Sequence, residues 1–131
     1  MAGSVTVSRI GVHRDAPVER IRIDWTADGN GAVSGTKVYN VAGVITRVTT
    51  VPAAGGNAPD DNYDVTLLDD EGVDLLAGLG ANRDTANTES VAPMLGAGTN
   101  VPVVVAGSIE LNVAAAGAAN KGAVVLYLDR R

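Results

Sequence analysis

The segment that decides the fold is Arg20-Ile21-Arg22-Ile23-Asp24-Trp25-Thr26. Apolar and charged residues alternate along it, so Ile21, Ile23 and Trp25 point to one side of an extended chain. This period of two is typical of a β-strand with one buried and one solvated face. Residues 63–67 and 109–113 repeat the pattern with acidic or polar residues outward. Three such segments predict antiparallel sheets that are solvated on one side.

Five further segments are rich in β-branched residues and end at Gly, Asn, Asp or Pro, which predicts more strands; they are residues 5–12, 36–41, 44–51, 101–106 and 123–128. In the first of them the apolar positions change from odd to even numbers, which predicts a bulge near Ser8 and Arg9. Asn40-Val41-Ala42-Gly43 has the turn chemistry to close a hairpin between the next two. Only residues 73–79 hint at a helix, of one or two turns.

Short strands with little helix between them predict an all-β fold, either an antiparallel β-sandwich or a small β-barrel, with about eight strands and long loops. The chain has 131 residues, which is enough for one core, so residues 1–131 should form a single domain. The turn-rich stretches 52–61 and 82–100 are expected to be exposed loops. We expect contacts with other proteins from these loops and from residues 1–7, which would form an extended arm.

The composition indicates a folded protein of modest stability. Apolar residues make up 46% of the chain and charged residues 19%, too apolar for a disordered chain. Val and Ala dominate and Phe is absent, so the core gains its stability in small increments; the aromatic residues are Trp25, Tyr39, Tyr63 and Tyr127. The 16 glycines raise the entropic cost of folding. Association with partners would raise the stability of the subunit.

The charge and the cysteine count restrict the partners. The formal net charge of −5 opposes binding to nucleic acid or to anionic lipid. The absence of Cys excludes disulfides and is compatible with a reducing cytoplasm. The N-terminus does not read as a secretory signal, and the longest apolar stretches fall far short of the roughly 20 residues that span a bilayer. We therefore expect a soluble protein without a nucleic-acid or membrane partner.

Candidates for catalytic chemistry are few. His13 is the only histidine and lies in an expected turn, where a solvated surface position is favoured over a catalytic one. Gly78-Leu79-Gly80-Ala81-Asn82-Arg83 lacks the third glycine of a nucleotide-binding loop. The serines lie in no nucleophile-elbow context; those considered are Ser4, Ser8, Ser34, Ser90 and Ser108. The sequence predicts no enzyme, no catalytic residue and no cofactor.

An acidic cluster is the strongest candidate for a metal site, because hard cations bind converging carboxylates; its members are Asp60, Asp61, Asp64, Asp69, Asp70, Glu71 and Asp74. Their spacing does not match the calcium-loop pattern. Asp69-Asp70-Glu71-Gly72 is more simply a turn between Leu68 and Val73. We expect the turn and assign no metal ligand, and a cation bound at residues 60–74 is the alternative.

Basic residues concentrate in the first third of the chain while the middle is acidic; they are Arg9, Arg14, Arg20, Arg22 and Lys37. A subunit polarised in this way could dock head to tail or onto a complementary shell. The alternative is an ordinary solvated strand face whose charges discourage pairing between sheet edges.

The order of these segments resembles a group of small structural proteins of tailed bacteriophages. The most specific runs are Asn62-Tyr63-Asp64-Val65-Thr66-Leu67 and Gly78-Leu79-Gly80-Ala81-Asn82-Arg83, and the likeness extends over most of the chain from residue 20 onward. The resemblance implies a virion component that is made and assembled in the host cytoplasm without disulfides. It brings no catalytic residues.

We expect a capsid decoration, or cement, protein. Such a protein would form a homo-oligomer, with a trimer favoured, and would bind the major capsid protein or another virion protein. Many small apolar contacts, multiplied by avidity over repeated sites, would stabilise the head exterior. The alternatives are a structural component of the neck, tail or head-fibre base, and a carbohydrate-binding module of a receptor-binding fibre. The last needs an exposed aromatic cluster, whereas Trp25 and Tyr63 are expected to point inward.

Overall fold

The computed structural model describes residues 3–11, 18–95, 99–100 and 102–130. Most of this part of the chain is extended, and its one helical turn is the 3-10 helix Gly55–Asn57. None of its helices has the length and apolar character needed to cross a membrane. The strands are β1 (Ser4–Gly11), β2 (Val18–Thr26), β3 (Val33–Pro52), β4 (Asp64–Leu68), β5 (Glu89–Val91), β6 (Met94–Leu95), β7 (Thr99–Asn100), β8 (Val103–Ala114) and β9 (Lys121–Asp129).

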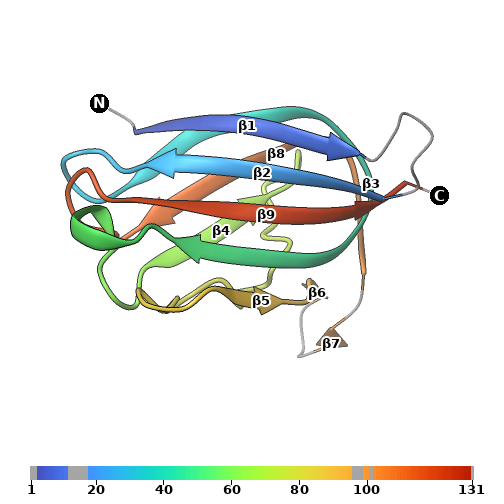
Figure 1. The fold of residues 1–131 in the computed structure, drawn as a ribbon. Coiled ribbons are helices and arrows are strands. Elements are labelled where there is room, and N and C mark those ends of the chain that lie inside the picture. Colours follow the sequence, from blue (N-terminus) through green and yellow to red (C-terminus); the bar gives the residue numbers. More distant parts are fainter. Residues whose placement is uncertain (1–2, 12–17, 96–98, 101, 131) are drawn as a thin grey trace.

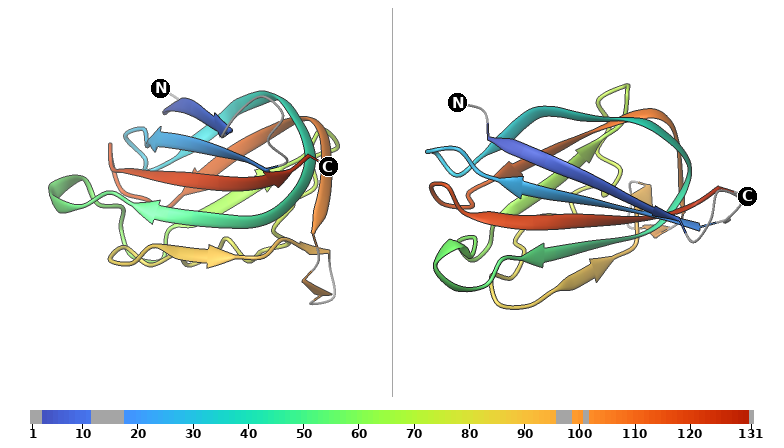
Figure 2. Two further views of the ribbon diagram at one scale, coloured as in Figure 1. Left: turned by 45° about the vertical axis from the view of Figure 1, so that its right-hand side comes forward. Right: turned by 45° about the horizontal axis from the view of Figure 1, so that its top comes forward.

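Seven of these strands form one antiparallel sheet, which folds over on itself into two layers (Figure 1). The strand order is β1-β2-β9-β3-β8-β4, and β5 pairs with β3. The long strand β3 belongs to both layers, because its N-terminal part pairs with β8 and its C-terminal part with β9 and β5. The front layer is thus β1, β2, β9, the end of β3 and β5, and the back layer is the start of β3, β8 and β4 (Figure 2). The predicted all-β fold is confirmed.

The core lies between the two layers and contains the residues that the alternating patterns place inward. Ile21, Ile23 and Trp25 of β2 are buried, as are Leu67 of β4 and Leu111 of β8. The other two alternating segments are likewise half-buried strands, within β4 and β8. The rings of Trp25 and Tyr63 lie 5.8 Å apart between their centroids and are tilted by 50°. The prediction that both aromatic residues point inward is confirmed.

The hairpin predicted at residues 40–43 is wrong, because the chain continues through them as β3. Asn40 and Gly43 do adopt positive φ angles, of 59° and 143°. The pairing with β8 shifts register between Val38 and Val41, so these residues bend the strand instead of reversing it. Residues 101–106 and 109–113 were also predicted as separate strands, but residues 103–114 are the single strand β8, which passes through Gly107 at a φ of 137°.

The bulge predicted near Ser8 and Arg9 is also wrong, since the register between β1 and β2 runs without a shift over the full length of β1. The apolar positions change parity for another reason. Arg9 occupies an inward position at the sheet edge, where its guanidinium binds the carboxylate of Glu19. Ile10 then points outward and is 48% exposed.

Residues 73–79 form successive turns and no helix. The carboxylate of Asp74 accepts the backbone N–H groups of Leu67, Leu76 and Gly78, which satisfies donors that a helix would otherwise pair. The expected loop 52–61 contains the 3-10 helix, and the expected loop 82–100 contains β5, β6 and β7. Residues 4–7 of the expected N-terminal arm belong to β1, whereas Met1 and Ala2 lie outside the described residues.

Candidate functional site

The outer face of the front layer carries three arginines around strand β9. The register places Arg20 of β2 and Arg47 of β3 on either side of Tyr127, and Arg22 of β2 next to Val125. These side chains face away from the core, because their neighbours along each strand are the buried ones. We call this surface the arginine face; it consists of Arg20, Arg22, Arg47, Val125 and Tyr127.

Between its charged ends, Lys121 and Asp129, strand β9 is apolar on both of its faces. Val124, Leu126 and Leu128 point into the core, while Ala123 and Val125 point outward on the solvent side. Val125 is nevertheless only 5% exposed, because longer side chains on the neighbouring strands cover it. An ordinary half-buried strand would carry polar residues on this face. An apolar strip lined by arginines is instead the composition that protein interfaces favour.

Arg47 is held in one orientation. Its guanidinium carbon lies 4.4 Å from the centroid of the Tyr127 ring. Its Nε donates to the Ser90 Oγ at 3.2 Å, and that hydroxyl lies 2.8 Å from the Thr49 hydroxyl. No hydrogen bond to another described residue occupies its Nη1 or Nη2. The fixed side chain therefore presents both Nη atoms outward as donors.

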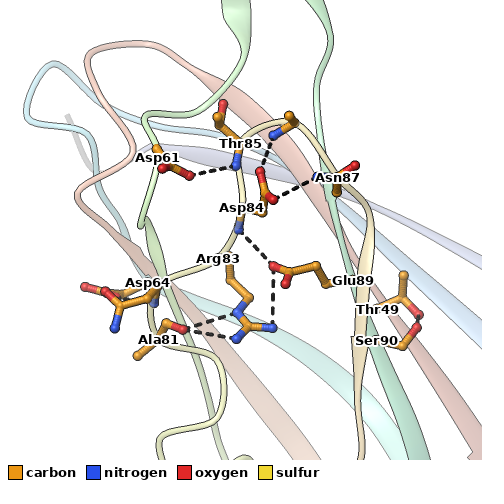
Figure 3. Close-up of polar contacts among 12 residues, drawn as sticks. Thr49, Asp61, Asp64, Ala81, Arg83, Asp84, Thr85, Asn87, Glu89 and Ser90 are labelled. Atoms are coloured by element: carbon orange, nitrogen blue, oxygen red, sulfur yellow. Dashed lines mark hydrogen bonds and ion pairs between the residues drawn. The ribbon is translucent and has the colours of Figure 1, made fainter.

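The loop that leads into β5 fixes the position of Ser90. Glu89 accepts the backbone N–H of Asp84 at 2.8 Å and lies 3.6 Å from the Nη1 of Arg83 (Figure 3). Asp61 accepts the N–H of Thr85 from across the loop. Hydrogen bonds from the Asn87 side chain and the Ala86 N–H hold the pKa of Asp84 below its ordinary value. This polar network orders the loop up to Glu89, the residue before Ser90.

Arg22 and Arg20 also have N–H donors that make no hydrogen bond within the described residues. The Nε of Arg22 lies 3.0 Å from the Asp24 Oδ1 in a half-exposed ion pair, and its Nη atoms make no hydrogen bond within the described part of the chain. Arg20 has no ion-pair or hydrogen-bond partner there. A shallow hollow of about 270 Å³ lies among the three arginines, and a second of about 350 Å³ adjoins it at Arg22 and Val51.

This arrangement can bind anionic groups beside an apolar surface. Lys121 and Asp24 line the second hollow, so four cationic side chains and one carboxylate gather here on a protein whose net charge is −5. Guanidinium groups with free Nη donors bind carboxylates or phosphates with two parallel hydrogen bonds.

The basic residues predicted to polarise the chain do not form one patch. Arg20 and Arg22 lie on the arginine face, but Arg9 binds Glu19 and the carbonyl oxygens of Tyr39 and Asn40 at the edge of β1. Lys37 lies in the back layer opposite Glu110. His13 and Arg14 lie outside the described residues. Sequence reasoning missed Arg47, which the register of β3 and β9 brings beside the other two.

The acidic cluster consists of separate carboxylates that mostly accept backbone N–H groups. Asp69 accepts from Glu71 and Val73, which confirms the turn predicted at residues 69–72. Asp64 accepts from Asn82. Asp70 accepts the N–H and hydroxyl of Ser108, and these hydrogen bonds lower the pKa of Asp70. Within the described ranges, His, Cys, Asp and Glu do not gather in a group that could hold a metal ion.

The glycine-rich run 78–83 has a packing role. The carbonyl of Gly80 accepts the N–H of Val65 in β4 at 2.8 Å. A Cβ at Gly80 would lie 2.0 Å from the carbonyl oxygen of Val65, so the close approach of the loop requires glycine here. Residues 78–82 are turns and bends, which confirms that this run is a loop.

The fold and this site together define a class: an all-β protein with one antiparallel sheet folded into two layers, whose front layer carries arginine side chains on its outer face. Comparison with known proteins places the chain in no particular family, because no family pattern matches it and no similar curated protein or solved structure was found.

Proposed function

We propose that this chain is a non-enzymatic virion structural protein, a decoration protein that oligomerises and stabilises the exterior of a phage head. The observation that carries the proposal is the arginine face, where oriented guanidinium groups flank the outward apolar residues of β9. The resemblance of residues 62–67 and 78–83 to small tailed-phage proteins supplies the virion context.

The arginine face has the composition of a protein-binding surface. Arginine and tyrosine are enriched among the residues that dominate binding energy in protein interfaces. Arg47 and Tyr127 are already stacked, so little side-chain freedom is lost when they are covered.

Small contacts can give tight attachment when they are repeated. A head presents many identical sites, and an oligomer that engages several of them at once gains affinity by avidity. The predicted contact arms, the loops and residues 1–7, would face the shell, while the arginine face would hold protein partners in place. Charge contacts of this kind weaken as salt screens them.

A carbohydrate-binding function is not favoured. Trp25 and Tyr63 are buried in the core, and the ring of Tyr127 is covered by Arg47. Tyr39 is the one of the four aromatic residues that is mostly exposed, at 66%. Sugar recognition by stacking uses exposed rings, so we keep the head-decoration function as the proposal.

The test uses phage heads that lack this protein. Purified protein is added, the heads are sedimented, and the bound protein is quantified. In a second measurement the heads, with and without the protein, are heated and the temperature at which they release DNA is recorded. We expect many copies per head, distributed over the shell, and a higher release temperature. Failure to bind, or attachment only at the neck or tail in immunogold images, would contradict the decoration function.

A further inference from the structure

A second surface, on the back layer, complements the arginine face. The turn after β4 carries Asp69, Asp70 and Glu71, which line a hollow of about 170 Å³ together with Val104 of β8. Val104 is 72% exposed and Val73, at the end of the turn, is 57% exposed. We call this surface the acidic turn; it consists of Asp69, Asp70, Glu71, Val73 and Val104.

We propose that the arginine face of one copy binds the acidic turn of another, so that copies of this chain associate head to tail. The inference rests on the proposed function, because it names the partner that the arginine face holds in the oligomer. It assigns the contact between subunits, and leaves the contact with the shell to other surfaces.

The two surfaces match in charge. Three guanidinium groups stand on one surface and three carboxylates on the other, and each surface has apolar side chains among its charges. Arg–carboxylate pairs form two parallel hydrogen bonds when the Nη atoms are free, as they are in Arg22 and Arg47. Val73 and Val104, which are largely exposed in the single chain, would be covered in this contact.

Part of each surface is ordered before the copies meet: Arg47 on the arginine face, and Asp69 and Asp70 on the acidic turn. Asp69 accepts hydrogen bonds from two backbone N–H groups of its own turn, and Asp70 accepts one from the backbone N–H of Ser108 in β8. The positive charge of Lys37 also lowers the pKa of Asp70. The side chain of Glu71 makes no hydrogen bond within the described residues, so its carboxylate is available to a partner. Surfaces that are ordered in advance lose less entropy on binding.

One copy cannot bring its own two surfaces together. The arginine face is the outer side of the front layer, whereas the acidic turn follows β4 and contacts β8 in the back layer (Figure 2). A contact between different surfaces of identical copies is heterologous, and it closes into a ring when the rotation between copies permits. A cyclic trimer, the oligomer expected from the sequence, is one ring of this kind.

The experiment mixes two variants that each lack one surface. R20E/R47E keeps the acidic turn, and E71K/V104K keeps the arginine face. All four residues are surface positions, and circular dichroism with thermal melting checks that both variants fold. R20Q/R47Q provides a milder loss of the same face. A54E/N57E/A86E/A118E adds the same amount of negative charge as R20E/R47E at exposed loop positions away from both surfaces.

Sedimentation velocity of the purified full chain gives the outcome. We expect the wild type and A54E/N57E/A86E/A118E to associate with rising concentration, and their association constants to fall at least about tenfold in high salt. Each of the two surface variants alone should stay monomeric. Their mixture should form a 1:1 complex that does not grow further, because only one competent pair of surfaces remains.

Three outcomes would overturn the proposal. They are a wild type that stays monomeric at all concentrations, a mixture of the two variants that forms no complex, and an R20E/R47E variant that associates like the wild type. Binding of phosphatidylserine vesicles by a wild type that stays monomeric would assign the face to lipid phosphate instead. If the copies associate as expected but do not bind heads, the decoration function fails and the head-to-tail contact stands.

Discussion

Arg47 and Tyr127 stand directly opposite each other in the paired strands β3 and β9, with the guanidinium carbon 4.4 Å from the centroid of the ring. Eighty positions of sequence separate them, so only the fold creates this contact. The Arg47 guanidinium stacks on the Tyr127 ring, and the Arg47 Nε donates a hydrogen bond to the Ser90 hydroxyl. The pair is therefore both a local source of stability and the fixed centre of the arginine face.

The stacking between Arg47 and Tyr127 should be measurable as a coupling energy. In a double-mutant cycle with R47A and Y127L, we expect a coupling of about 0.5–1 kcal/mol in the free energy of unfolding, the range for exposed cation–π pairs. Urea unfolding provides the values. Arg20 also stands opposite Tyr127, from β2, without such stacking, so the R20A/Y127L cycle should give a smaller coupling. Equal couplings in the two cycles would argue against the stacking.

The ion pair between Arg9 and Glu19 should make stability depend on acid pH. Glu19 is 8% exposed and accepts hydrogen bonds from the Arg9 Nη2 at 2.8 Å and Nε at 3.1 Å. These bonds hold the pKa of Glu19 below its ordinary value, although burial acts in the opposite direction. Because the folded-state pKa is the lower one, the stabilisation is complete above the unfolded-state pKa and is lost as the pH falls through the folded-state pKa.

The variant R9M tests this dependence. At neutral pH we expect it to lose about 1–3 kcal/mol of unfolding free energy, because a largely buried carboxylate is left without its partner. The loss should shrink when Glu19 becomes protonated, and urea titrations at a series of acid pH values follow it. E19Q serves as the control, since it removes the titrating group. A loss in R9M that is the same at every pH would show that the carboxylate is not responsible.

The close contact between Gly122 and Trp25 should make even one methyl group costly. A Cβ at Gly122 would lie 2.5 Å from the Trp25 Cζ2, inside the core. We expect G122A to lose about 1–3 kcal/mol, as overpacked cores do. G56A is the matched control, because no atom lies within 4 Å of its added Cβ; its stability should change by less than about 1 kcal/mol. Thermal melting compares them, and equal stabilities would contradict the packing.

The buried hydroxyl of Thr50 should contribute little to stability. No hydrogen bond of normal geometry reaches it or the Tyr63 hydroxyl within the described structure. Burial raises the pKa of Tyr63, and the nearby Thr50 hydroxyl lowers it in part. Because T50V removes an unpaired buried polar group, we expect unchanged stability or a gain of up to about 1 kcal/mol by calorimetry. A loss of more than about 1 kcal/mol of stability in T50V would mean that the Thr50 hydroxyl does have a hydrogen-bond partner in solution.

Much of the fold could be predicted because its pattern is local. The alternation of Ile21, Ile23 and Trp25 requires only the side-chain period of an extended strand, and the structure buries all three. The hairpin at residues 40–43 was predicted wrongly because Asn and Gly serve two purposes. Both residue types permit positive φ angles, and these angles bend a strand as readily as they close a turn.

The candidate site was predicted only in part, because it depends on pairing between distant strands. Arg20 and Arg22 could be placed on a solvated face from their own strand alone. No local signal brings Arg47 beside them, since the pairings of β9 with β2 and β3 decide that. The apolar outer side of β9 could not be predicted from the sequence for the same reason. A run of apolar residues does not show which of its two faces is covered by neighbouring side chains.

The binding of R20E/R47E to phage heads that lack this protein tests the central claim most directly, beside wild-type protein and N30E/S34E/A81E/A118E. This control adds the same negative charge at exposed positions outside the arginine face, the acidic turn and the expected contact arms. Bound copies per head are counted after sedimentation at equal protein concentrations. If the arginine face is the functional surface, heads should bind far fewer copies of R20E/R47E than of the wild type, and the control variant should bind like the wild type. Equal occupancy by all three folded proteins would contradict it.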